Sequence, residues 1–388
     1  MSLASALRAG QRLQPSELAR RINTSGLRAY TTNSAVPGDA ASTHYEQPQQ
    51  LYHKQRAVIF PGQGSQFVGM GRDLFDKFAA SRQVFEEVDS VLGFKLSDMI
   101  FRGDLQELTL TKNAQPAIVA VSTAGLRALE HDTGMAASKL FSFAMGHSVG
   151  EYSALIAANA MSLADGIRLV RTRGESMQDA IKEREYAMSA CILRKASIAD
   201  VLAEVDRVQQ EIAHEVDEVV QVANINSSSQ IVLSGTRLAV DRALASLQSK
   251  RLAMRAVNLP VSAPFHCSLM APAKRVLAAR IAELSPIRDQ SDWTIQVVSN
   301  VTAEPYATAE AAQRLLGEQV DRPVLWLQSM QFLKSKHGIC RWGAMGPGNV
   351  VGNLVGKEFA KDIVRRLSDA AAITDFAAVL NRQTKRGF

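Results

Sequence analysis

The chain has 388 residues, 46% hydrophobic and 21% charged, which is the composition of an ordinary globular protein with a sizeable core. No apolar run reaches about 18 residues, so we expect no membrane span. The net charge of +6 is concentrated at the start: residues 1–38 hold five arginines, no lysine and one acid, a charge of +4 that leaves +2 for residues 39–388. A body so close to neutral gives no reason to expect nucleic-acid binding.

The N-terminal segment has the composition of a mitochondrial presequence. Residues 1–38 are rich in Arg, Ser and Ala, and their leucines could line one side of a helix opposite the arginines. A secretory signal would need a continuous apolar stretch, which is absent. We therefore expect a presequence and a mature protein in the mitochondrial matrix; a disordered basic tail is the alternative. Residues 39–54, with their Gly, Pro, Ser and Thr, are predicted to be a linker.

The three cysteines are odd in number and widely spaced, and they match neither a disulfide framework nor a metal-binding pattern. They favour a reducing compartment. We expect no metal site.

The first half of the folded part alternates apolar strands with helical patterns. Residues 56–60 (RAVIF) predict a buried strand that ends in a Pro-Gly loop, and residues 114–130 predict a long apolar helix. A second buried strand is expected over residues 139–145, before a Gly-His-Ser-Val-Gly turn. Ser162 has the spacing of a helix N-cap, and the helix that it opens should run to about Lys182.

A segment of different character follows. Its pattern predicts strand, helix, strand, strand, helix and strand over residues 187–193, 197–216, 218–224, 229–235, 237–250 and 252–258. We therefore predict a large α/β-hydrolase-like domain with a parallel sheet, residues 55–186 and 259–380, in which a further strand covers residues 296–300. The small ferredoxin-like α+β domain, residues 187–258, is inserted into it, and residues 381–388 form a C-terminal tail.

The turn at residues 146–150 has the G-x-S-x-G pattern of a nucleophile elbow. A tight strand-to-helix turn tolerates only glycine at its flanks and pushes the serine hydroxyl out above the sheet. Ser148 is therefore a candidate nucleophile. The amide of Val149 opens the next helix and could donate to a developing oxyanion. A chance match in a glycine-containing loop is the alternative.

A serine nucleophile needs a base, and the positions of the seven histidines leave His266 and His337 as candidates. His266 lies in a loop stiffened by Pro260 and Pro264, and catalytic groups are often held on such loops. A buried structural histidine remains the alternative for this residue.

Arg173 lies in the middle of an apolar helix face. A turn of 100° per residue places it with Leu169, Val170 and Met177, while the charged residues of the helix fall on the other side. A buried guanidinium is costly unless a carboxylate meets it. Either a protein acid or a substrate carboxylate would satisfy it, and a transferable acyl group with a free carboxylate suggests malonyl.

Over residues 56–380 the chain resembles the malonyl-CoA:acyl carrier protein transacylases, including mitochondrial members and the acyltransferase domains of fatty acid and polyketide synthases. The matching motifs are FPGQGSQ at 60–66, QPA at 115–117, GHSVGEYSAL at 146–155, RGxxMQ at 173–178, NINS at 224–227, PFHC at 264–267 and GPG at 346–348. The 25-residue step from Ser148 to Arg173 also matches.

The resemblance implies a role for each matching position. Ser148 would carry the acyl group, His266 would be its base and later the acid, and Arg173 would hold the malonyl carboxylate. The amides of Gln63 and Val149 would form the oxyanion hole. The remaining implied contacts with the acyl group or near it come from the side chains of Gln63, Gln115 and Asn226.

Two further positions bear on orientation and selectivity. In the family a backbone carbonyl orients the histidine, and the corresponding residue here is Leu325, where bacterial members often have Gln. Phe265 is typical of malonyl-selective members, because a phenyl ring would crowd an α-methyl branch; the discrimination from one methyl is about 1–3 kcal/mol.

The resemblance implies malonyl-CoA and acyl carrier protein as partners, a role in mitochondrial type II fatty acid synthesis, no metal or redox cofactor, and a monomer. Two alternatives share many of these features. A serine hydrolase would transfer the acyl group to water, and a non-catalytic subunit of a fatty acid synthesis assembly would have no use for the intact catalytic residues.

Overall fold

The computed structural model describes residues 55–180, 185–194, 197–214 and 218–385. The presequence and linker predicted over residues 1–54 lie outside the described residues.

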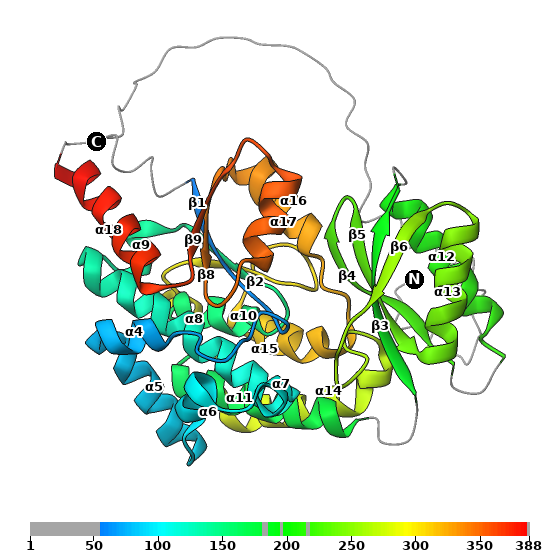
Figure 1. Ribbon diagram of the computed structural model, residues 1–388, viewed down its shortest axis with the longest axis horizontal. Coiled ribbons are helices and arrows are strands. Elements are labelled where there is room, and N and C mark those ends of the chain that lie inside the picture. Colours follow the sequence, from blue (N-terminus) through cyan, green and yellow to red (C-terminus); the bar gives the residue numbers. More distant parts are fainter. Residues whose placement is uncertain (1–54, 181–184, 195–196, 215–217, 386–388) are drawn as a thin grey trace, which may run out of the picture. The chain divides into compact units, whose positions relative to one another are not determined.

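Five parallel strands form the central sheet, in the order β7-β2-β1-β8-β9 (Figure 1). Their bounds are β1 Arg56–Phe60, β2 Phe143–Gly146, β7 Gln296–Val298, β8 Arg341–Met345 and β9 Ile363–Leu367. The strands are apolar on both faces because both are covered. Along β1, Val58 and Phe60 enter one core cluster, whereas Ala57 and Ile59 enter the other.

Helices pack on the two faces of this sheet (Figure 1). The cluster that contains Val58 includes residues of most helices: α4 Arg72–Lys77, α5 Ala79–Leu92, α6 Leu96–Arg102, α7 Leu105–Thr109, α8 Thr111–Thr133, α9 Ala137–Leu140, α10 Gly150–Ala157, α11 Leu163–Asp179, α14 Ala271–Leu284, α15 Ala309–Glu318 and α18 Ala370–Lys385. The cluster that contains Ile59 includes α16 Trp326–His337 and α17 Val350–Glu358. Three short 3₁₀ turns complete the elements: η1 Ser268–Met270, η2 Gln290–Asp292 and η3 Gln319–Asp321.

A second sheet has four antiparallel strands in the order β4-β5-β3-β6. Its elements follow in chain order as β3 Tyr186–Leu193, α12 Ile198–Glu211, β4 Val220–Ser227, β5 Gln230–Thr236, α13 Arg237–Ser249 and β6 Ala253–Asn258. This is the predicted βαββαβ order, with both helices on one side of the sheet (Figure 1). The mixed α/β fold with a parallel sheet and a small ferredoxin-like part is thus confirmed. The domain limits themselves stay predictions, because the described residues group into one compact unit.

Strand β4 joins the two sheets through the segment before α16. Ile225 N–H donates to Val324 O at 3.0 Å, and Val324 N–H donates to Ala223 O at 2.8 Å. The core around Ile59 continues without a break into residues of the small sheet, among them Ile225 and Leu233. The small sheet is therefore tied to the large one by backbone pairing and by a shared core.

Several predicted boundaries differ from the structure, and two of the differences are informative. The strand expected over residues 139–145 starts later, at Phe143, because Ala137–Leu140 form helix α9; a short apolar run cannot be assigned to helix or strand by periodicity alone. The tail expected from residue 381 is still helical, since α18 continues to Lys385 and its apolar face carries Leu380 into the core. None of the described helices has the length and hydropathy needed to span a bilayer.

Candidate active site

Ser148 occupies a strained turn between β2 and α10. Its φ is 53°, in the left-handed region that non-glycine residues rarely adopt. A Cβ on Gly146 would lie 1.9 Å from the carbonyl group of Gly150, and one on Gly150 would lie 2.6 Å from the oxygen of Phe60. The two flanking glycines are thus sterically required, as the elbow pattern predicts, and the turn holds the hydroxyl at the carboxyl ends of β1 and β2.

His266 lies next to this hydroxyl. Its Nε2 is 2.7 Å from Ser148 Oγ, and its side chain is buried. Its Nδ1 lies 2.8 Å from Gln319 O and 3.2 Å from Arg322 O, both of which can only accept. The proton is therefore on Nδ1, so Nε2 is free to take the serine proton. His337, the other candidate, packs against Phe143 and Phe332 at the end of α16 and is not part of the site.

The expectation that Leu325 orients the histidine is wrong. Its carbonyl accepts from the N–H of Ser329 at 3.0 Å and from the hydroxyl of that residue at 2.8 Å, in the first turn of α16. The 3₁₀ turn η3 instead brings the carbonyls of Gln319 and Arg322 to Nδ1. A backbone carbonyl does accept the hydrogen bond of His266 Nδ1, but the carbonyl comes from the turn before Pro323.

Burial, followed by the positive charge of Arg173, lowers the pKa of His266 to about 3. The imidazole is consequently neutral at physiological pH, which is the form that a general base requires.

Arg173 faces into the site from α11, as the helix periodicity predicts. It is 1% exposed, and its Nη2 donates to Ser148 Oγ at 3.1 Å and to Gln319 Oε1 at 2.9 Å. Its buried Nε has no hydrogen-bond partner, and no ion pair joins the guanidinium to an acid among the described residues. Of the two possibilities that the sequence leaves open, direct pairing with a protein acid is therefore not what the structure contains.

Glu151 is linked to Arg173 through hydrogen bonds to the side-chain amide of Gln319. Glu151 is fully buried and accepts from the N–H of Asn300 at 3.0 Å, from the hydroxyl of Tyr306 and from Nε2 of Gln319. Burial raises the pKa of Glu151 to about 7, although these hydrogen bonds act in the opposite direction. The carboxyl group therefore gives the guanidinium a partial, indirect compensation.

Gln319 contacts every member of this arrangement. Its Oε1 accepts from Arg173, its Nε2 donates to Ser148 O at 3.0 Å and to Glu151, and its backbone carbonyl faces His266. Because Glu151 accepts from Nε2, the amide must present its oxygen to the guanidinium. Sequence reasoning missed this residue, since a lone glutamine after a helix carries no local signal.

Two backbone amides remain available for an oxyanion. Within the described residues, neither the N–H of Gln63 nor that of Val149 donates a hydrogen bond, whereas Ser148 N–H is bound to Asn300 Oδ1 at 2.7 Å. The loop that carries Gln63 lies against the elbow, since a Cβ on Gly62 would be 2.7 Å from His147 O. Val149 is the N-cap of α10, so the positive end of the helix dipole adds to its donor.

The remaining predicted residues take different positions. Gln115 is buried on α8, with Nε2 3.6 Å from Met177 Sδ and Oε1 unpaired. The side chain of Gln63 donates to Thr111 Oγ1 at 3.1 Å. Phe265 is 7% exposed beside His266. Asn226 does not reach Ser148; its Oδ1 lies 2.9 Å from Nε2 of His147, and it fixes that ring away from the nucleophile.

No group of three or more His, Cys, Asp or Glu side chains in the described part of the chain could hold a metal ion. The three cysteines are free thiols, and Cys191 and Cys267 are buried.

The fold and this site, with its serine and histidine 2.7 Å apart, are those of an acyltransferase. The chain belongs to the acyl transferase domain family, which matches residues 57–324. A curated relative is the malonyl CoA-acyl carrier protein transacylase of Bacillus subtilis, 40% identical over 316 residues that cover 81% of this chain and 92% of the relative.

Solved structures agree with this placement. The acyl-carrier-protein-S-malonyltransferase of Bartonella henselae superposes with a TM-score of 0.76 at 39% identity and covers 84% of this chain and 99% of its own. A malonyl-transacylase solved in complex with its type II polyketide synthase acyl-carrier protein gives a TM-score of 0.76 at 33% identity, with coverage of 84% and 99%. Within the family, the chain therefore groups with the malonyl CoA-acyl carrier protein transacylases.

Proposed function

We propose that the protein transfers the malonyl group from malonyl-CoA to the phosphopantetheine thiol of an acyl carrier protein through a malonyl-serine intermediate. The observation that carries this proposal is Arg173: a buried guanidinium, without an acid directly bound to it, 3.1 Å from the nucleophilic oxygen. Its fork matches a carboxylate in charge and geometry. An acetyl group would leave it unmatched, so selectivity for an anionic acyl group follows.

The first half-reaction loads the serine. His266 Nε2 takes the proton of Ser148 as Oγ attacks the thioester carbonyl, and the oxyanion lies between the amides of Gln63 and Val149. When the C–S bond breaks, the CoA sulfur leaves with the proton that His266 held. The malonyl group is now an ester on Ser148.

The second half-reaction is the reverse with another thiol. The phosphopantetheine sulfur gives its proton to His266 and attacks the ester carbonyl, after which Ser148 leaves and recovers the proton. Because the malonyl-serine intermediate forms and CoA leaves before the carrier thiol reacts, the proposed mechanism is ping-pong. Every step uses side chains and amides of this chain, and the mechanism needs no metal or redox cofactor.

The solved complex of a similar transacylase with its acyl-carrier protein supports a carrier protein as the acceptor. The arginine-rich, acid-poor residues 1–38 support a mitochondrial presequence, and we infer that the protein acts as a monomer in matrix fatty acid synthesis. Import of a fusion of residues 1–54 to a fluorescent protein tests the location, and cytosolic fluorescence would contradict it.

Arg173→Ala tests the carboxylate contact. We expect malonyl transfer to fall about 100-fold in kcat/KM, since charge-assisted hydrogen bonds are lost, while acetyl transfer rises relative to it. Arg168→Ala is the matched control, because Arg168 lies on the same helix, is 42% exposed and pairs with Asp165. An unchanged ratio of malonyl to acetyl transfer in Arg173→Ala would remove the basis of the proposal.

Intact mass spectrometry separates the proposal from its alternatives. Malonyl-CoA should add one malonyl group to the wild type and none to Ser148→Ala, and a carrier protein should then remove it. Loss of the adduct to water faster than to the carrier would indicate a hydrolase. No adduct at all would indicate a non-catalytic subunit.

A further inference from the structure

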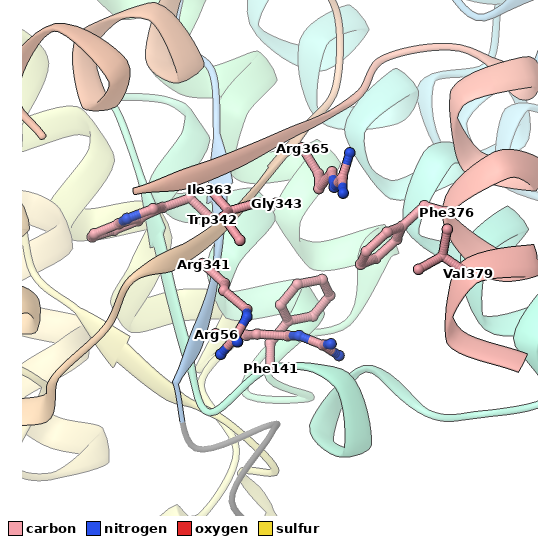
Figure 2. A pocket seen from close by; sticks show the side chains of 9 residues that line it. All are labelled: Arg56, Phe141, Arg341, Trp342, Gly343, Ile363, Arg365, Phe376 and Val379. Atoms are coloured by element: carbon pink, nitrogen blue, oxygen red, sulfur yellow. The ribbon is translucent and has the colours of Figure 1, made fainter. Parts of the chain in front are cut away.

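A cavity of about 210 Å³ lies at the amino ends of the strands, at the opposite end of the sheet from Ser148. Figure 2 shows the side chains that line it. It is lined by three arginines and several apolar side chains from β1, β8, β9, α18 and the end of α9, notably Arg56, Arg341, Arg365, Phe141, Phe376 and Val379. None of the described residues that line it is acidic.

The strand register explains why the arginines gather here. Arg56 and Arg341 are partners on the neighbouring strands β1 and β8, and Gly343 and Arg365 are partners on β8 and β9. Side chains alternate between the two faces of a strand, so Arg341 and Gly343 lie on the same face of β8. Neighbouring strands are about 4.8 Å apart, so residues paired across strands lie side by side. The rings and methyl groups of Phe141 and Leu367 pack directly over Gly343, since a Cβ there would lie 3.0 Å from Phe141 and 3.2 Å from Leu367.

The charges in this cavity favour an anion. Arg341 already donates to Gln55 Oε1 at 3.0 Å, so the guanidinium that can meet a ligand is that of Arg365. Arg365 is exposed on β9, and no ion pair or side-chain hydrogen bond of its guanidinium occurs among the described residues. The nearest acid along β9 is Asp362, which is already bound by Lys334 and by Trp342 Nε1. An anion in the cavity would therefore meet positive potential.

The apolar wall adds a second requirement. Phe141 is 1% exposed, and Phe376 and Val379 project from α18 toward it, so the inner part of the cavity is hydrocarbon (Figure 2). A volume of about 210 Å³ is many times the about 10–15 Å³ that a single water molecule needs, so a hydrocarbon chain can enter. Arg365 can pair with a carboxylate at the mouth while a hydrocarbon chain displaces water from the interior.

We propose that this cavity binds a carboxylate with a medium-length hydrocarbon tail, of which octanoate is the model compound. The site shares no residue with the acyl-transfer site and does not depend on the proposed function, because the binding is measured directly.

Isothermal calorimetry on the full-length protein tests the proposal, with octanoate as the probe. Octanamide lacks the charge, and acetate and inorganic phosphate lack the tail. We expect saturable binding of octanoate and at least tenfold weaker binding of the three others. If phosphate bound as tightly as octanoate, the cavity would be an anion site only. If octanamide bound as tightly, the site would be purely apolar, and if octanoate gave no saturable heat, there would be no site. Each of these outcomes overturns the proposal.

Variants place the binding in this cavity. Arg365→Gln should weaken octanoate binding about tenfold, whereas Arg366→Gln, which changes an exposed neighbour outside the lining, should leave it unchanged. Val379→Trp, which fills the apolar end, should weaken it independently of charge. Arg173→Ala should have no effect, because Arg173 lies with Ser148 at the other end of the sheet. Unchanged affinity in Arg365→Gln, or loss in Arg173→Ala, would refute the assignment.

Discussion

Gln319→Glu is the substitution that probes the site most directly. The side chain is fully buried, and Gln to Glu keeps its shape and its oxygen toward Arg173, 2.9 Å away. The change replaces the amide group that donates to Ser148 O and to Glu151 by a second acceptor. Two carboxyl groups then face each other, and one of them must hold a proton.

The magnitude follows from the contacts. The introduced carboxyl group, when ionised, would pair directly with Arg173, and a charged hydrogen bond of this kind is worth about 1.5–3 kcal/mol. A malonyl carboxylate would have to compete with that pair, so we expect kcat/KM for malonyl-CoA to fall about 10- to 100-fold. The acetyl group of acetyl-CoA has no carboxylate that would compete for Arg173, so kcat/KM for acetyl transfer should fall less than that for malonyl transfer.

The assay measures transfer of both acyl groups to a carrier protein, and far-UV circular dichroism checks the fold. Gln313→Glu is the matched control, since it adds the same charge at a half-exposed position on α15. If Gln319→Glu retained the wild-type rate and the wild-type ratio of malonyl to acetyl transfer, the link from the amide to the guanidinium charge would be wrong.

Three further predictions concern other parts of the structure. The pKa of His266 is lowered to about 3, so the free enzyme keeps a neutral base as the pH falls. In a pH profile of kcat/KM, the decrease at acid pH that is caused by protonation of His266 should therefore have its midpoint well below pH 6.5. A midpoint at or above pH 6.5 would contradict the buried neutral imidazole. Gly146→Ala should lower the free energy of unfolding by more than about 3 kcal/mol, or prevent folding, because the new Cβ would lie 1.9 Å from backbone atoms. Gly356 lies in a helix with open space around it, so Gly356→Ala should raise the free energy of unfolding by up to about 1 kcal/mol. Urea denaturation measures both values. Phe265→Ser should raise the rate with methylmalonyl-CoA relative to malonyl-CoA by about tenfold in a competition assay, and an unchanged ratio would show that the ring does not limit the α-substituent.

The parts of the molecule that sequence reasoning recovered are those with a local pattern. The elbow at Ser148 has fixed glycine spacing, the inward position of Arg173 follows from helix periodicity, and the small sheet follows from alternation of strand and helix patterns. The parts that it missed depend on contacts between distant segments. Gln319 meets Ser148 across 171 residues, and no local pattern marks such a partner.

The wrong assignment of Leu325 and the missed role of Glu151 have the same physical origin. The family resemblance points to Leu325, whereas the geometry of the 3₁₀ turn at Gln319–Asp321 decides which carbonyls reach Nδ1. Glu151 is part of a matching motif, but its role depends on Tyr306 and Asn300, which come from a different region of the chain. Side-chain networks of this kind need the tertiary structure.

The pairing of β4 with Val324 has a consequence for engineering. Val324 lies two residues after Arg322, whose carbonyl helps to orient the catalytic base, so a shift of the inserted βαββαβ segment is passed to His266 over a very short path. Chimeras that exchange this segment between relatives should therefore preserve the backbone pairing of Ala223 and Ile225. A swap that loses it would misalign the base although every catalytic side chain were present.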